Sequence, residues 1–380
     1  MDGSKQPTRA AIVVVRPVID LVRVEHPLNF LMDASGTAAE WEALADRCHA
    51  SPFLRPGWLH AWWESFGKGT LEILTLRRGW DGRLVGLLPL RRLSGALLSP
   101  TNWHSPQFGL LVEDGEAAEA LMCALFRDRP RRVDLRFLDH DAAGQLGIQA
   151  MSEGYHIICR TIQRSPYVTI DGDWDSYQRG IGKKVRSELL RRRRRLEQEG
   201  RLVLAVEDGG VRLEELLAEG LRVEAAGWKT EQGTAIGSHP ETRRFYTRIA
   251  RWADTRGWLR LAFLRLEGRA LAFDFCLEYD RVHYLLKTGY DPAYRQLGPG
   301  KLIRYEMLAR AFRSGMTSYE FLGADEPWKL EWTQMGRERQ VIQAFRPSPL
   351  GVLDWSAHAH GQPLAKRVAD RMRWCRSRGS

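Results

Sequence analysis

The sequence predicts an α/β fold built as a duplicated mixed sheet with flanking helices. Each half of the chain repeats one order of elements: a helix, an antiparallel hairpin, a further strand, a helix and a final strand. The two hairpins share a turn pattern, Asp81-Gly82-Arg83 and Glu267-Gly268-Arg269, in which glycine permits the positive φ of a tight turn. With 44% hydrophobic and 27% charged residues, the 380-residue chain has the composition of a globular protein, which excludes global disorder and coiled-coil rods.

Apolar periodicity and turn residues define the elements of the first half. In chain order they are a helix at Pro56–Phe66, strands at Leu71–Arg77 and Leu84–Leu90, a strand near Phe108–Val112, a helix at Ala117–Phe126 and a strand at Val133–Leu138.

The second half repeats this order. Its elements are a helix at Glu241–Thr255, strands at Leu259–Leu266, Arg269–Glu278 and Val282–Thr288, a helix at Lys301–Arg313 and a strand at Ser318–Leu322. The expected organisation is a tail with a first strand (1–22), a first domain (23–180), an arginine-rich linker helix (181–200), a second domain (201–345) and a basic tail (346–380).

The net charge of +10 is concentrated in two segments. Lys183–Arg195 carries +7 and residues 361–380 carry +5, so the rest of the chain is close to −2. The rest of the chain therefore lacks the positive charge expected on the surface of a dedicated RNA-binding protein. In a helix at Lys183–Arg195 the five consecutive arginines point in all directions, because each residue turns by about 100°. We interpret it as a solvated connector; the alternative is an anion or RNA contact.

Several classes of protein are excluded. No apolar run approaches the roughly 18 residues of a membrane helix, so we expect a cytoplasmic protein without membrane insertion. The 5 cysteines include no close pair, and the histidines have no metal-ligand spacing, so we expect neither a disulfide framework nor a metal. The sequence does not predict the oligomeric state.

The pattern that most clearly indicates a ligand site lies in the loop between the strand at Val282–Thr288 and the helix at Lys301–Arg313. Arg295, Gly298 and Gly300 form R-x-x-G-x-G, with Pro299 and Lys301 beside the glycines. A glycine loop that opens a helix presents free N–H groups and the positive end of the helix dipole, which suits a pyrophosphate. The corresponding loop of the first half, near Glu113–Glu116, lacks the pattern, so we expect one cofactor site per chain.

In its motifs the chain resembles the GNAT acyltransferase superfamily. Within that superfamily it is most similar to the Fem-like tandem branch and to the CelD-like group of cellulose-biosynthesis acetyltransferases. The resemblance covers roughly residues 40 to 335. The residues that carry it are Ser51-Pro52-Phe53, Trp58, Gly86 to Pro89-Leu90, Lys184 to Glu197, Trp228-Lys229, Gly233, Phe245-Tyr246, Lys287 to Asp291, Pro299-Gly300 and Gly323. It implies a tandem GNAT fold, an acyl donor that is usually acetyl-CoA, and a link to polysaccharide biosynthesis; Fem-like relatives use a charged tRNA instead.

Acyl transfer to an amine requires a base, donors for the oxyanion and an acid for the leaving thiolate. Strand alternation places Ala270, Ala272, Asp274, Cys276 and Glu278 on one face. Asp274 is the first candidate base and Glu278 the second; a structural carboxylate is the equally weighted alternative.

Other residues complete the candidate site. Tyr290 is the candidate acid, and Trp228, Lys229, Lys287 and Asp291 are candidates for binding the acceptor. A covalent route through Cys276 is disfavoured, because no histidine adjoins it. The predicted activity is acyl-CoA-dependent N-acylation of a small-molecule amine or saccharide precursor. A tRNA-dependent aminoacyl transferase and a non-catalytic binding module are the alternatives.

Overall fold

The computed structural model describes residues 18–24, 27–33, 35–226 and 239–361 of the chain. Three predictions fall outside these residues: the tail at 1–17, the basic segment at 362–380, and the acceptor-binding roles of Trp228 and Lys229. No helix in the described ranges has both the length and the apolar character needed to span a membrane.

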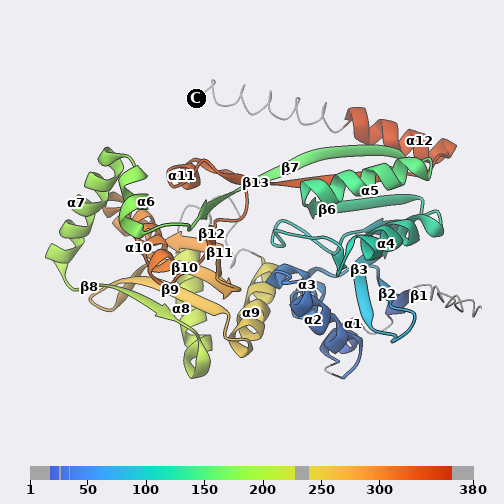
Figure 1. Cartoon of the computed structure of the whole chain (residues 1–380). Coiled ribbons are helices and arrows are strands. Elements are labelled where there is room, and N and C mark those ends of the chain that lie inside the picture. The colour runs from blue at the N-terminus through green and yellow to red at the C-terminus, as the bar shows by residue number, and fades with distance from the viewer. Residues whose placement is uncertain (1–17, 25–26, 34, 227–238, 362–380) are drawn as a thin grey trace, which may run out of the picture.

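The described strands form one 13-stranded mixed sheet (Figure 1). The strands are β1 (Val18–Val24), β2 (Thr70–Arg77), β3 (Leu84–Leu93), β4 (Ala96–Leu98), β5 (Leu111–Val112), β6 (Arg132–Leu138), β7 (His156–Thr169), β8 (Leu202–Glu207), β9 (Leu259–Leu266), β10 (Arg269–Tyr279), β11 (Val282–Tyr290), β12 (Ser318–Glu320) and β13 (Gly336–Phe345). Their order across the sheet is β1-β2-β3-β4-β6-β13-β7-β12-β11-β10-β9-β8, with β5 beside β3. The duplicated mixed sheet is confirmed.

Helices cover both faces of this sheet. They are α1 (Pro27–Met32), α2 (Thr37–Arg47), α3 (Pro56–Phe66), α4 (Gly115–Arg127), α5 (His140–Ser152), α6 (Trp174–Gly180), α7 (Lys183–Glu199), α8 (Leu213–Ala226), α9 (Pro240–Thr255), α10 (Pro299–Arg313), α11 (Pro327–Leu330) and α12 (Pro349–Ser356). Short 3₁₀ turns occur at Pro52–Leu54 (η1), Gly210–Arg212 (η2) and Pro292–Leu297 (η4), and one π-helical turn (η5) at Ala357–Gly361.

The two halves exchange a strand. β13 follows the second half in sequence, yet it lies between β6 and β7 and pairs antiparallel with both. The long strand β7 then joins the two halves, because its first part pairs with β13 and its end at Tyr167–Thr169 pairs with β12. The sheet is therefore continuous across the whole molecule.

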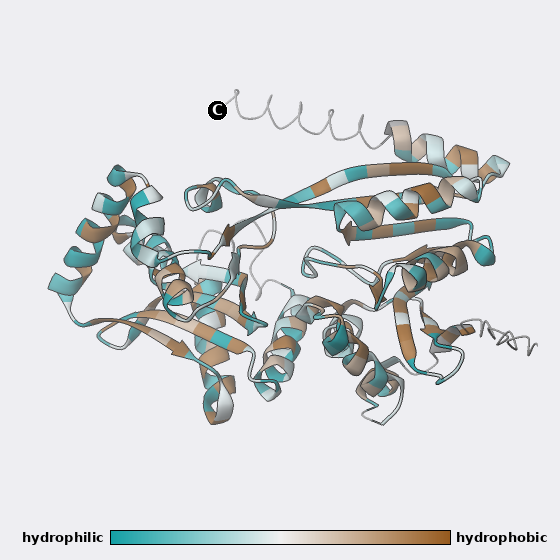
Figure 2. Ribbon diagram, viewed as in Figure 1, coloured by the Kyte–Doolittle hydropathy of each residue, from teal (hydrophilic) through white to brown (hydrophobic). Residues whose placement is uncertain are grey.

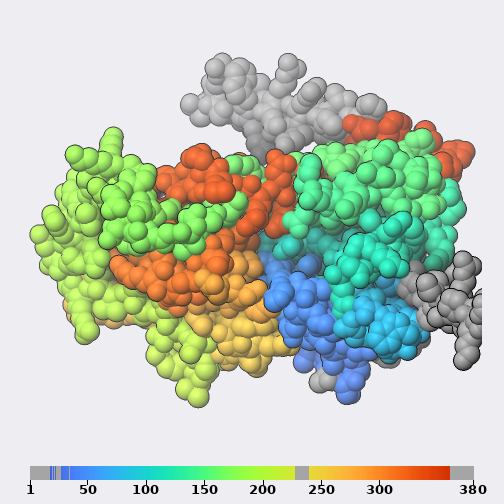
Figure 3. Space-filling model, in the orientation of Figure 1, coloured from blue at the N-terminus to red at the C-terminus, as the bar shows by residue number. Residues whose placement is uncertain are grey.

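On one face the two halves share a single hydrophobic core. Helices α3 and α9 pack side by side there, with the ring centroids of Trp58 and Phe245 5.4 Å apart (Figure 1). A Cβ built on Gly57 would lie 2.0 Å from the Trp252 indole nitrogen, so the two helices approach as closely as glycine permits. Figure 3 shows the same direct contact between the blue first-half atoms and the yellow and orange second-half atoms.

Two predicted details are wrong. The strand expected at Phe108–Val112 is reduced to β5, and the parallel neighbour of β6 is the unpredicted β4. The alternation predicted for β10 fails at its start, because a bulge between Ala270 and Ala272 moves Ala270 to the face of Phe273 and Leu271 to the face of Ala272.

The arginine-rich helix α7 is confirmed and runs on to Glu199. Leu189 and Leu196 are buried against the second half, while most of the helix surface is hydrophilic (Figure 2). Its last residue is Glu199, and Gly200 follows as the C-cap with φ +154 and ψ −171.

Candidate active site

A gap between β11 and β12 opens the sheet of the second half. The two strands pair in parallel only at Val282–Tyr284 and Ser318–Glu320, and beyond that point they separate. A cavity of about 880 Å³ lies at this gap, bordered by residues 285–290 on one side and residues 321–324 on the other. Such a volume accommodates a cofactor-sized ligand.

Strand β11 carries a β-bulge beside this cavity and presents side chains to both faces of the sheet. The register of β10 with β11 shifts so that Phe275 pairs with Lys287 and Cys276 with Leu285, which leaves Leu286 without a cross-strand partner in the register. Thr288 then contacts Arg304 on the α10 face, whereas the Lys287 ammonium lies 5.4 Å from the Tyr246 ring on the α8–α9 face.

The predicted phosphate loop borders the cavity on the α10 face. Gly298 has the left-handed conformation (φ +60, ψ +47) and directly precedes α10, which starts with Pro299. Arg295, Gly298, Gly300 and Lys301 all line the cavity, as does Tyr290. A Cβ on Gly300 would lie 3.0 Å from the Tyr290 ring. The structure thus brings the loop and the candidate acid together at the positive end of α10.

The five arginines of α7 have different surroundings. Arg192 lines the cavity, and its Nη1 lies 2.1 Å from the position of a Cβ on Gly298. Arg193 forms ion pairs with Glu197 at 2.9 Å and with Glu306 of α10 at 2.7 Å. Arg191, Arg194 and Arg195 are exposed. Sequence periodicity did not identify Arg192, because its role depends on how α7 docks against the loop.

The other end of the cavity, on the α8–α9 face, combines both halves of the chain. Glu224 of α8, Tyr246 of α9 and Lys287 of β11 line it together with His104 from the first half. The imidazole Nδ1 of His104 is 3.3 Å from the Tyr246 hydroxyl. Burial, assisted by Lys287 and His239, lowers the pKa of His104 to about 4, so this imidazole is neutral at pH 7.

Asp274 does not line the cavity. It is fully buried, and its Oδ1 accepts a hydrogen bond from Arg304 Nη2 at 2.8 Å. Arg304 is itself 1% exposed and also donates to the Tyr319 hydroxyl. Burial alone would lower the pKa of Arg304, but the charge of Asp274 raises it above its usual value.

Glu278 lies at the far end of β10 from the loop. Arg260, Arg310 and His283 contact its carboxylate. Burial would raise the pKa of Glu278, but the hydrogen bonds with His283 and Arg310 lower it to about 2. This carboxylate is therefore ionised at neutral pH and committed to its partners.

Two other candidates are also placed in structural contacts. Asp291 caps the η4 turn by accepting from Ala293 N at 3.0 Å, and it pairs with Arg269 at 2.6 Å. Cys276 is fully buried, and burial raises the pKa of its thiol well above the usual value.

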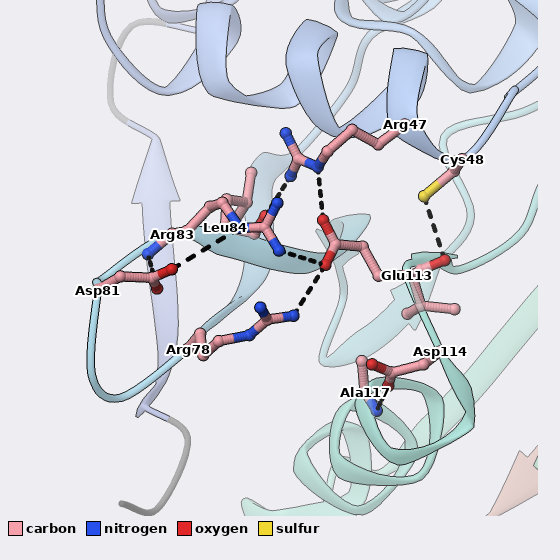
Figure 4. A network of polar contacts seen from close by, with 10 residues as sticks. Arg47, Cys48, Arg78, Asp81, Arg83, Leu84, Glu113, Asp114 and Ala117 are labelled. Atoms are coloured by element: carbon pink, nitrogen blue, oxygen red, sulfur yellow. Dashed lines mark hydrogen bonds and ion pairs between the residues drawn. The ribbon is translucent and has the colours of Figure 1, made fainter.

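The corresponding helix start in the first half is filled by the chain's own carboxylates (Figure 4). Asp114 caps α4 by accepting from Ala117 N at 2.8 Å. The adjacent Glu113 accepts hydrogen bonds from Arg47, Arg78 and Arg83. An internal carboxylate therefore occupies the position at which the second half presents its glycine loop.

Within the described ranges, no group of three or more His, Cys, Asp or Glu side chains is arranged to hold a metal ion.

Comparison with known proteins classifies the second half. Residues 183–330 match the family model described as an acetyltransferase (GNAT) domain. The match begins at the first residue of α7 and includes β10, β11, the glycine loop and α10. The protein is therefore an acyltransferase that contains a GNAT domain. A comparison with curated protein sequences gives no match.

Solved structures share the fold of nearly the whole chain. FemX is 12% identical with a TM-score of 0.55, covering 80% of this chain and 96% of FemX. The C-terminal domain of a putative lysylphosphatidylglycerol synthetase from Agrobacterium fabrum is 10% identical with a TM-score of 0.53, covering 85% and 97%. L-PGS from Bacillus licheniformis is 14% identical with a TM-score of 0.51, covering 83% and 93%. At these identities the similarity shows the fold alone.

Proposed function

We propose that the protein transfers an acyl group from an acyl-CoA, most simply acetyl-CoA, to an amine, as a CelD-like member of the Fem-like tandem branch. The observation that supports this most directly is the glycine loop at the start of α10, which borders the cavity where β11 and β12 separate. The acceptor is a small-molecule amine, and a saccharide precursor fits the resemblance. We place the reaction in the cytoplasm.

An acyl-CoA supplies the thioester whose carbonyl carbon the amine attacks. The N–H groups at the start of α10, with Arg295 and Arg192, bind the pyrophosphate. The N–H of Leu286 at the bulge polarises the carbonyl. As the C–N bond forms and the C–S bond breaks, Tyr290 gives its proton to the leaving thiolate and the amine loses a proton to solvent.

The first prediction concerns stoichiometry. Titration of the full chain with coenzyme A in a calorimeter should saturate at one coenzyme per chain, because Glu113 and Asp114 fill the first-half position. A stoichiometry of two would contradict the assignment of one functional loop. Absence of any binding would contradict the proposed function itself.

A second candidate function is aminoacyl transfer from a charged tRNA. The observation that favours it is the exposure of Arg191, Arg194 and Arg195 on the helix that also carries the cavity residue Arg192. Exposed arginines attract nucleic-acid phosphates without contacting a small cofactor.

Single arginine variants distinguish the two functions. Arg192→Gln should raise the KM for acetyl-CoA about tenfold or more with little change in kcat, since a charge-assisted hydrogen bond is worth about 1.5–3 kcal/mol. Arg194→Gln is the matched control, because it removes an exposed charge from the same helix and retains helix propensity. It should leave acetyl-CoA kinetics unchanged.

Under the tRNA hypothesis, activity should depend on the exposed arginines of α7. The triple variant Arg191→Gln, Arg194→Gln and Arg195→Gln should then lose activity, and the slope of log K against log salt should flatten by roughly 2 to 3. Unchanged acetyl-CoA turnover in the triple variant would reject the RNA role.

A further inference from the structure

We infer that the first half of the chain forms the acceptor subsite of the second, and that the acceptor is a primary amine attached to a ring. The inference rests on the proposed acyl-CoA function, because it concerns the face of the cavity opposite the phosphate loop. Trp103 and His104 supply this wall, and both come from the loop between β4 and β5 of the first half.

The cavity itself separates donor from acceptor. The phosphate loop and Tyr290 lie with α10 on one face of the sheet, and Lys287 and Tyr246 lie on the other. A donor whose pyrophosphate sits at the loop can reach the gap between β11 and β12 only from the α10 face. The acceptor must therefore approach from the opposite face, where Trp103 and His104 border the cavity.

The loop that carries these residues is held firmly by the first half. Trp58 of α3 donates its indole N–H to Ser105 Oγ at 3.1 Å, and the Ser51 hydroxyl donates to Gln107 at 2.9 Å. The His104 ring stacks on Phe66 at 5.6 Å with an interplanar angle of 12°. These contacts fix the wall before a ligand arrives, which lowers the entropy lost on binding.

Trp103 determines the chemistry of the wall. Its side chain borders the cavity and is nevertheless 71% exposed. It contacts Phe137 in an edge-to-face arrangement at 5.4 Å and 86°, which orients the indole without covering it. An open indole face in a cavity binds the apolar face of a ring, whether a sugar or an aromatic ring.

The polar groups beside Trp103 are His104, Glu224 and Lys287. His104 is neutral at pH 7, so it does not add a second positive charge to that of the Lys287 ammonium, which lies on the same face. Its Nδ1 is engaged with Tyr246, so Nε2 is the nitrogen that can contact the acceptor. The carboxyl group of Glu224 borders the same end of the cavity and can accept a hydrogen bond from an amine.

Steady-state kinetics with three amines test the inference. The probes are glucosamine (a sugar ring), tyramine (an aromatic ring) and n-butylamine (no ring), each with saturating acetyl-CoA and detection of released thiol. The wild type should prefer one ring amine over n-butylamine. Trp103→Ala should raise the KM for that amine about tenfold, which corresponds to about 1.4 kcal/mol, and leave the KM for acetyl-CoA unchanged.

Two further variants make the result decisive. Trp80→Ala is the matched control, because Trp80 is 69% exposed in the same half and does not border the cavity; it should behave as wild type. His104→Ala should lower kcat/KM for the ring amine without weakening coenzyme A binding in the calorimeter.

Three outcomes overturn the inference while leaving the donor site intact: equal KM values for Trp103→Ala and Trp80→Ala, a preference for n-butylamine, or coenzyme A binding without turnover of any probe. Failure of the wild type to bind coenzyme A would instead reject the proposed function.

Discussion

Gly300→Asp should weaken coenzyme A binding about 100-fold or more. The substitution adds a negative charge at the start of α10, where the pyrophosphate would lie. Two unit charges 4 Å apart repel by about 4 kcal/mol at a surface-like dielectric constant, and about 2.7 kcal/mol corresponds to 100-fold in affinity. Calorimetry on a variant shown to be folded by circular dichroism measures the loss.

Two controls separate charge from shape. Gly300→Ala adds only a Cβ, which would lie 3.0 Å from Tyr290 and requires a small shift of that ring, so its effect should be modest. Gly115→Asp places the same charge at the start of α4 in the first half, where a Cβ meets nothing within 4 Å, and it should leave binding unchanged. Equal binding by folded Gly300→Asp and wild type would show that the loop is misassigned.

Asp274→Asn should destabilise the fold by about 3–5 kcal/mol. The change leaves the buried charge of Arg304 without its carboxylate partner, and removing one member of a buried ion pair typically costs this much. The midpoint of urea unfolding measures the loss. Because Asp274 is paired with Arg304 and does not line the cavity, we propose that its role is structural.

The double variant Asp274→Leu with Arg304→Met provides the complementary test. Replacing a buried pair by apolar groups of similar volume is often neutral or stabilising, so the double variant should recover much of the lost stability. If the single variant Asp274→Asn instead kept its stability and lost turnover by two or more orders of magnitude, Asp274 would be the catalytic base.

Local patterns in the sequence were sufficient for most elements. The predicted bounds are correct to within two residues for helices α3 and α10 and for strands β2, β9 and β10. Strand β3 extends three residues beyond its predicted end. These elements depend on periodicity and turn glycines, which act over a few residues. The loop at Arg295–Lys301 was predictable for the same reason, since a glycine pattern before a helix is a local signal.

What the sequence did not reveal depends on contacts between distant segments. The bulge at Leu271 reverses the faces of Ala270 and Leu271, and the bulge at Leu286 interrupts the alternation of β11; no residue type marks either bulge. A structural role for Asp274 was one of the two alternatives, but its partner Arg304 lies 30 residues away on α10 and could not be identified from the sequence. Trp103 and His104 reach the cavity only because the two halves pack together.

The exchanged strand β13 sets the order in which the protein can be completed during synthesis. The first half emerges from the ribosome with β6 and β7 already made, but the strand that belongs between them ends only at Phe345. Until residues 336–345 are translated, these two strands have unpaired edges, which are sites of aggregation in nascent chains. A ribosome stalled before this point therefore holds a chain whose first half is unfinished, and holdase chaperones would have to protect it.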